Sequence, residues 1–76
     1  MKIFDKLKYN INQYVILTKT RSFKNGVTIN EGTEVKIVDR SFFKKTYSIV
    51  YNGEIYDGYT ELDFIPGQDE NRYINN

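Results

Sequence analysis

Several residue types are missing from this chain of 76 residues. It has no cysteine, so neither disulfide bonds nor thiolate metal sites hold it together, and it is compatible with a reducing compartment. Histidine is also absent, so a zinc site would need carboxylates alone, and the common triads that use histidine as a base are excluded. We therefore expect no metal, no other cofactor and no catalytic activity.

Long apolar runs are lacking as well. No stretch is long enough to cross a bilayer, and residues 1–5 lack the continuous apolar region of a secretion signal. We therefore expect a cytoplasmic protein with no membrane partner. At this length the chain forms one domain with one modest core.

The net charge of +1 hides an asymmetry along the chain. Residues 1–45 carry ten Lys or Arg against four Asp or Glu, whereas residues 46–76 carry one against six. Such a split is typical of a basic face for an anionic partner, but it also arises where two halves of a small β fold interleave. About half of the residues are Ile, Lys, Asn, Tyr or Phe. Codons rich in A and T encode these residues, so we expect an AT-rich source such as a low-GC bacterium, its phage or a mobile element.

The strongest local signal lies in residues 47–56, where Asn52-Gly53 separates two β-prone runs. Both residues tolerate the positive φ that a two-residue type I′ turn needs. The pattern predicts a hairpin with three facing pairs: Tyr51 with Glu54, Val50 with Ile55, and Ile49 with Tyr56.

The other elements follow from apolar spacing and turn residues. We expect a short amphipathic helix over 3–11, strands over 13–21 and 34–38, a connection over 22–30 with a turn at Asn25-Gly26, a polar and basic loop over 39–46, a helical turn over 61–63, and a short strand over 64–65 that Pro66-Gly67 ends.

Three stretches carry a resemblance to a known fold: residues 26–38 (GVTINEGTEVKIV), 47–51 (YSIVY) and 62–66 (LDFIP). Their pattern of apolar residues and glycines resembles that of the small SH3-like barrels of bacteria and phages. The resemblance implies an all-β, five-stranded SH3-like barrel over 13–67. From the local sequence itself we expect 1–12 to be a short helix or frayed terminus, and the polar residues 68–76 to be a flexible tail. Eukaryotic SH3 domains resemble this plan but bind proline-rich ligands in a groove that contains tryptophan. This chain has no tryptophan, so we do not expect it to bind polyproline.

Aromatic residues cluster in two places. On the expected hairpin register Tyr47, Ile49, Tyr51 and Tyr56 share one face, which is either a platform for a partner or part of the core. Two adjacent phenylalanines, Phe42 and Phe43, lie in a loop and cannot easily both be buried, so we expect at least one of them to anchor a partner.

Three hypotheses of function follow. In the first, the protein is a non-catalytic protein-binding module, an accessory or inhibitor protein of a phage or mobile element that covers a host protein surface. Its binding residues are Phe42, Phe43, Tyr47 and Tyr51, with Arg40 and Lys44 at the rim.

In the second hypothesis the protein binds nucleic acid. SH3-like barrels hold the two basic loops on one side, which implies a single patch of Arg21, Lys24, Arg40, Lys44 and Lys45 beside Phe23. The third hypothesis is a small enzyme, which needs a pocket that brings together two of Asp57, Glu61 and Asp63. Open edge strands also allow a homodimer.

Overall fold

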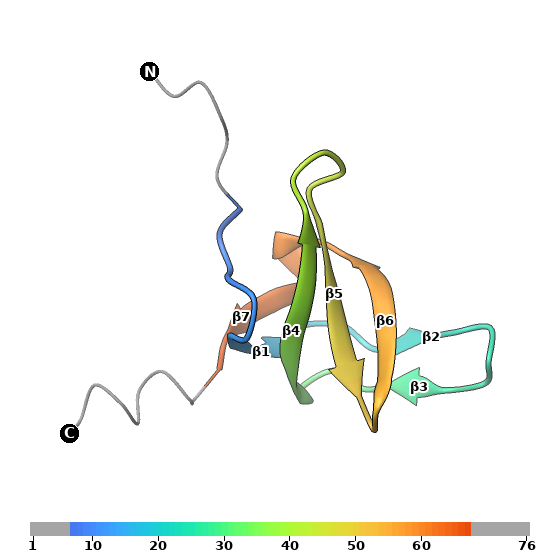
Figure 1. Ribbon diagram of the computed structural model, residues 1–76. Coiled ribbons are helices and arrows are strands. Elements are labelled where there is room, and N and C mark those ends of the chain that lie inside the picture. The colour runs from blue at the N-terminus through green and yellow to red at the C-terminus, as the bar shows by residue number, and fades with distance from the viewer. Residues whose placement is uncertain (1–6, 68–76) are drawn as a thin grey trace, which may run out of the picture.

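The computed structural model describes residues 7–67 and contains strands with one short 3₁₀ helix (Figure 1). The all-β class expected from the sequence is confirmed. The elements in chain order are β1 (Tyr14–Leu17), β2 (Arg21–Ser22), β3 (Thr28–Ile29), β4 (Glu34–Ser41), β5 (Thr46–Tyr51), β6 (Glu54–Tyr59), the 3₁₀ helix η1 (Glu61–Asp63) and β7 (Phe64–Pro66).

Five strands form one antiparallel sheet in the order β6-β5-β4-β1-β7, and β2 pairs with β3 in a second, two-stranded sheet. In the view of Figure 1, β4, β5 and β6 run close to vertical, whereas β1, β2 and β3 run roughly horizontally near the lower part of these strands. Within residues 7–67 no ladder joins β6 to β7, so the expected closed barrel is not found. β7 has three residues, and Pro66 lacks the N–H that a further ladder would need.

The β5–β6 hairpin has the predicted register. Its facing pairs include Ile49 with Tyr56, Val50 with Ile55 and Tyr51 with Glu54. Asn52 and Gly53 adopt φ values of 50° and 81°, as a type I′ turn requires at both positions. The hairpin prediction is therefore confirmed.

Two bulges change which side chains face the core. The register between β4 and β5 shifts between Ile37 and Asp39, and the register between β5 and β6 shifts beyond Tyr56. In β6 the shift falls at Gly58, whose φ is 87°. Strict alternation would place Tyr56 and Tyr59 on opposite faces, but the extra residue lets both point inward, and both are buried.

The core settles the orientation of the tyrosine face of the hairpin. Tyr47, Ile49 and Tyr56 are buried, and Tyr51 is partly buried and packs against the core, so this face points inward. The full set of buried hydrophobic residues is Leu7, Tyr9, Val15, Leu17, Ile29, Val35, Ile37, Tyr47, Ile49, Tyr56, Tyr59 and Phe64.

Residues 7–12 form an N-terminal strap rather than part of a helix. The expected helix over 3–11 is therefore wrong for its described part, residues 7–11, and its beginning lies outside the described residues. Leu7 and Tyr9 are both buried, so the core includes residues before the expected barrel boundary at residue 13. The expected tail, 68–76, also lies outside the described residues.

Tyr9 fastens the strap to three parts of the fold. Its ring packs edge-on against the rings of Tyr47 and Phe64, with centroids 5.9 and 5.6 Å away. Its N–H donates to the Tyr47 hydroxyl (3.1 Å), its hydroxyl donates to the Phe64 carbonyl (3.3 Å), and its carbonyl accepts from Arg40 Nη1 (2.8 Å).

Gly67 packs so closely against β1 and Glu34 that a side chain at this position would not fit. Its N–H donates to the Tyr14 carbonyl (3.0 Å), and an added Cβ would lie 2.8 Å from that oxygen and 2.6 Å from Glu34 Oε2. Because the backbone of β1 must move to make room, we expect Gly67→Ala to lower the free energy of unfolding by about 1–3 kcal/mol. Urea denaturation measures this effect, and a variant as stable as the wild type would contradict it.

Candidate functional site

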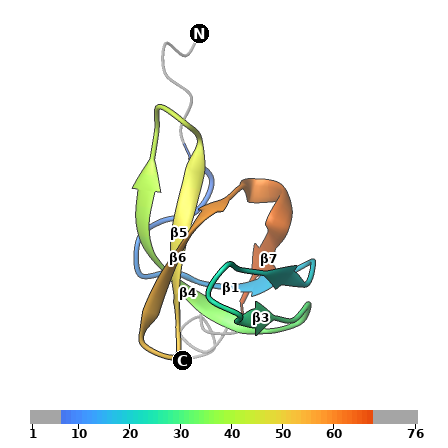
Figure 2. The same cartoon turned by 90° about the vertical axis from the view of Figure 1, so that its right-hand side faces the viewer.

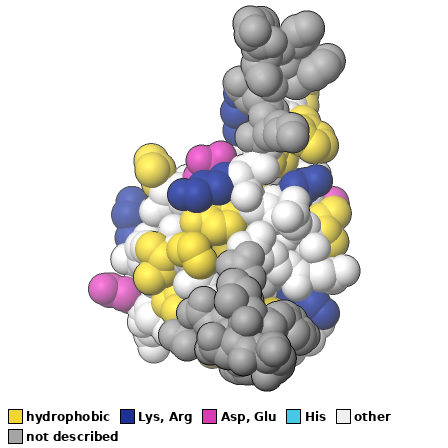
Figure 3. All heavy atoms as spheres, turned by 90° about the vertical axis from the view of Figure 1, so that its left-hand side faces the viewer, with side chains coloured by type: hydrophobic (Ala, Val, Ile, Leu, Met, Phe, Trp, Pro, Cys, Tyr) yellow, Lys and Arg dark blue, Asp and Glu magenta, His cyan; other side chains and the backbone are white. Residues whose placement is uncertain are grey.

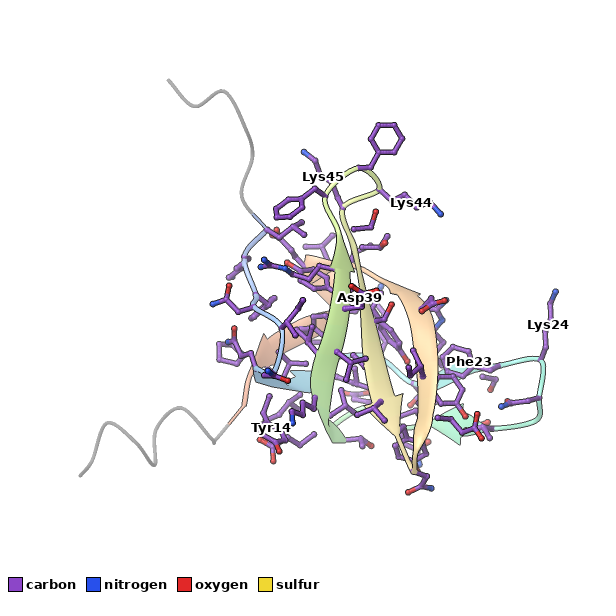
Figure 4. All side chains as sticks on the ribbon, in the orientation of Figure 1. Tyr14, Phe23, Lys24, Asp39, Lys44 and Lys45 are labelled. Carbon is purple, nitrogen blue, oxygen red and sulfur yellow. The ribbon has the colours of Figure 1, made fainter. Side chains whose placement is uncertain are left out.

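The β4–β5 turn, residues 42–45, is the most exposed aromatic feature of the described chain. It continues the two strands beyond the sheet, with Lys44 and Lys45 on either side of its tip (Figure 4). Lys45 takes the left-handed conformation (φ 59°), and the Lys44 N–H donates to Ser41 Oγ (3.2 Å), so the turn is tight. Strand therefore covers much of the loop expected over 39–46.

The two phenylalanines of the turn have different surroundings. Phe43 is 96% exposed, whereas Phe42 is 58% exposed and lies 5.2 Å from the guanidinium of Arg40. Nη1 of Arg40 also donates to the carbonyl of Tyr9 (2.8 Å) and to Asn10 Oδ1 (3.2 Å). Arg40 therefore links the strap to the base of the turn and holds Phe42 there, while Phe43 projects freely.

Two cations flank the phenylalanines of the turn: Arg40 at its base and Lys44 within it. Across residues 7–67 no carboxylate pairs with Arg40 or Lys44, and Arg40 Nε is buried without a hydrogen-bond partner. Lys44 follows Phe43 directly in the chain and also lines a surface hollow that contains Asp39 and Asp57.

The structure removes Tyr47 from the predicted partner surface. Its side chain is 1% exposed because the tyrosine face points inward and Tyr9 of the strap packs over it. Tyr51 lies at the opposite end of β5 from the turn, beside Asn52 and Gly53, and is half buried (Figure 1). The residues that stay together at the turn are Arg40, Phe42, Phe43 and Lys44.

The basic residues of the nucleic-acid hypothesis lie on two separate projections. Lys24 is in the β2–β3 turn, which extends away from the β4–β5 turn that carries Lys44 and Lys45 (Figures 1, 2 and 4). Arg21 folds back onto Phe23 and Tyr59. The two basic loops therefore do not form the single patch that was expected.

The carboxylates of the enzyme hypothesis are not gathered as expected. A shallow hollow of about 320 Å³ on the outer face of β4, β5 and β6 contains Asp57 together with Asp39, and neither Glu61 nor Asp63 lines it. Asp57 Oδ1 accepts a hydrogen bond from Ser48 Oγ (2.7 Å). Asp63 instead caps η1, where its Oδ2 accepts from the Thr60 N–H (2.9 Å).

Sequence reasoning missed the contribution of Asp39 to this hollow, because the bulge in β4 decides which face Asp39 occupies. No cluster of three or more Asp or Glu side chains that could hold a metal ion occurs among the described residues.

Apolar side chains also gather on the face that carries the strap and β7 (Figure 3). Ile11 in the strap and Ile65 in β7 are each about half exposed. Both are less exposed than Phe43, which is the most exposed large apolar side chain of residues 7–67.

The geometry defines a small all-β protein in which Phe43, the most exposed aromatic residue of the described chain, stands on a tight turn beside two lysines. No family model, curated protein or solved structure matches the chain. In the part of the chain that the structure describes, no helix has the length and apolar character needed to span a membrane.

Proposed function

We propose that this protein is a non-catalytic protein-binding module that docks through the β4–β5 turn, with Phe43 as the anchor. The observation that carries the proposal is the 96% exposure of Phe43 at the tip of a tight, strand-supported turn. Full burial of such a side chain in a partner contributes about 1.5–3 kcal/mol. Because the turn is already formed, little conformational entropy is lost when Phe43 binds.

The charges around Phe43 define the partner surface further. Lys44 lies next to it without an acidic partner among the described residues, so the fitting surface is an apolar pocket with carboxylates at its rim. Aromatic anchors with a charged rim are typical of small proteins that cover a partner's surface. An inhibitor or accessory protein of a phage or mobile element would act in this way.

The strand arrangement supports an SH3-like relationship as a proposal about the fold. β1 lies between β4 and β7, a tight hairpin joins β5 to β6, and a 3₁₀ turn precedes the short last strand. These are the parts that the sequence resemblance implied, although the described sheet is open.

A homodimer that pairs through the edge strands is less well supported than binding to another protein. The β6 edge carries Glu54 and Asp57 and no basic residue, so pairing two β6 edges would bring carboxylates together without compensation.

A pull-down from host lysate tests the proposal, with and without nuclease. The double variant Phe42→Ser/Phe43→Ser removes the anchor, and Ile55→Ser/Leu62→Ser is the matched control, because Ile55 and Leu62 are 64% and 83% exposed outside the turn. We expect the wild type and the control to capture one stoichiometric protein after nuclease treatment, and the Phe42/Phe43 variant to lose it. Equal capture by both variants, or recovery of nucleic acid alone with loss at high salt, would contradict the proposal.

A further inference from the structure

Arg21 on β2 is held by three contacts that fix its guanidinium group. The group lies 4.7 Å from the ring centroid of Tyr59 and 5.0 Å from that of Phe23, and its Nη1 donates to the Gly58 carbonyl (3.2 Å). Phe23 lies beside β6, away from the β4–β5 turn (Figure 4). Two aromatic rings and one carbonyl therefore orient this cation before any ligand arrives.

One edge of the guanidinium group is unused. No carboxylate of the described chain pairs with Arg21, and its one hydrogen bond within residues 7–67 uses Nη1. Nε and Nη2 are neither hydrogen-bonded there nor buried. These two nitrogens form the side of the guanidinium that grips a carboxylate through two parallel hydrogen bonds.

The bulge at Gly58 keeps this edge clear. A Cβ at residue 58 would lie 3.1 Å from Arg21 Nη2, and the positive φ of Gly58 gives the backbone the path that brings it beside Arg21. The neighbouring Tyr59 hydroxyl is buried without a partner. Burial raises the pKa of Tyr59, and the positive charge of Arg21 acts in the opposite direction, as expected for a cation close to that ring.

We propose that Arg21 is a binding site for a single carboxylate, supplied by an acidic peptide segment and gripped by Nε and Nη2. A nucleic-acid backbone fits less well, because it calls for several cations along its phosphates, and Lys24 lies at the far end of the β2–β3 turn (Figure 4). This site does not include Phe43, so a negative result for carboxylate binding at Arg21 would not contradict the proposed docking through the β4–β5 turn.

The test follows the Nε–Hε signals of the full chain by NMR while a carboxylate is added at constant ionic strength. The probes are N-acetylglutamate α-amide for a side-chain carboxylate, N-acetylglycine for a chain terminus, and inorganic phosphate and sodium chloride for comparison. We expect at least one carboxylate to shift the Arg21 signal saturably, with a Kd on the order of tens of millimolar, as suits one charge-assisted pair. The Arg40 signal is an internal control and should not move, because its Nε is buried.

Two variants make the test specific to the geometry. Gly58→Ala places a methyl group 3.1 Å from Nη2 and should weaken carboxylate binding at least fivefold, whereas Gly53→Ala, also at positive φ but with nothing within 4 Å of its Cβ, should leave it unchanged. Arg21→Lys keeps the positive charge but removes the guanidinium group that can donate two parallel hydrogen bonds. In the wild type we also expect carboxylate binding to shift the ring signals of Phe23 and Tyr59 saturably, and in Arg21→Lys this shift should be lost. This second readout tests the site even if Gly58→Ala does not fold. An equal response to chloride, saturation by phosphate alone, or unchanged binding in Arg21→Lys would overturn the proposal.

Discussion

Replacing Tyr9 with alanine is expected to lower the free energy of unfolding by about 3–5 kcal/mol, the usual cost of truncating a buried aromatic side chain. The Tyr9 ring packs edge-on against both Tyr47 and Phe64, which also contact each other, and its loss leaves a cavity beside the two rings. The backbone of Tyr9 also holds Arg40, so a loosened strap would free the guanidinium that orients Phe42. Urea denaturation of the full chain measures the loss.

Tyr9→Phe is the matched control for this prediction. It keeps the ring and removes the 3.3 Å hydrogen bond to the Phe64 carbonyl, so it should cost only about 0.5–1.5 kcal/mol. If Tyr9→Ala proved as stable as Tyr9→Phe, the strap would not be part of the core. A decrease of about 3–5 kcal/mol would be a large share of the free energy of unfolding of a small domain. Such a result would show that the fold requires the strap.

Phe43→Ser is expected to weaken binding to the partner by at least about 30-fold, or ~2 kcal/mol, which is the range of an interface hot spot. Its free energy of unfolding should change by less than about 0.5 kcal/mol, because the side chain is almost fully exposed. Calorimetric titration of the captured partner measures the first effect, and urea denaturation measures the second.

Ile55→Ser is the control for Phe43→Ser, because Ile55 is an exposed apolar residue on β6, away from the turn. It should bind the partner with wild-type affinity. Phe42→Ser should also cost some stability, since it removes the contact between Phe42 and Arg40. A Phe43→Ser variant with unchanged affinity would move the anchor to another surface.

Local patterns predicted the hairpin well. Asn52 and Gly53 tolerate the positive φ that a type I′ turn requires at both positions, which fixes the loop length and therefore the facing pairs next to the turn. In the strands expected over 13–21 and 34–38, Val15 and Leu17, and likewise Val35 and Ile37, are buried in the core and alternate with more exposed residues.

The strap was predicted wrongly because two patterns compete in it. Leu7 and Ile11 suit a helical period, but Leu7 and Tyr9 are the residues that are buried, and the aromatic surface of Tyr47 and Phe64 favours the irregular, non-helical path that packs Tyr9 against both rings. Only the assembled fold contains this surface. The local sequence therefore did not decide between the two forms.

The candidate site was predicted in part for a similar reason. Phe42 and Phe43 stood out because two adjacent phenylalanines in a loop cannot easily both be buried. Their distance from Lys24 depends on the course of the whole sheet, and the inward turn of Tyr59 depends on the bulge at Gly58. A glycine within a strand is a local signal of such a bulge, but the expected hairpin ended at Tyr56, so Gly58 was not recognised as part of β6.

The central claim, that Phe43 docks into a protein, is tested most directly by photo-crosslinking. A benzoylphenylalanine replaces Phe43 in one sample and Ile55 in a control, and both are irradiated in host lysate treated with nuclease. We expect one protein to crosslink at position 43, to be displaced by excess wild-type protein but not by excess Phe43→Ser, and to be absent from the control. Equal crosslinking from positions 43 and 55, or none from position 43, would contradict the account.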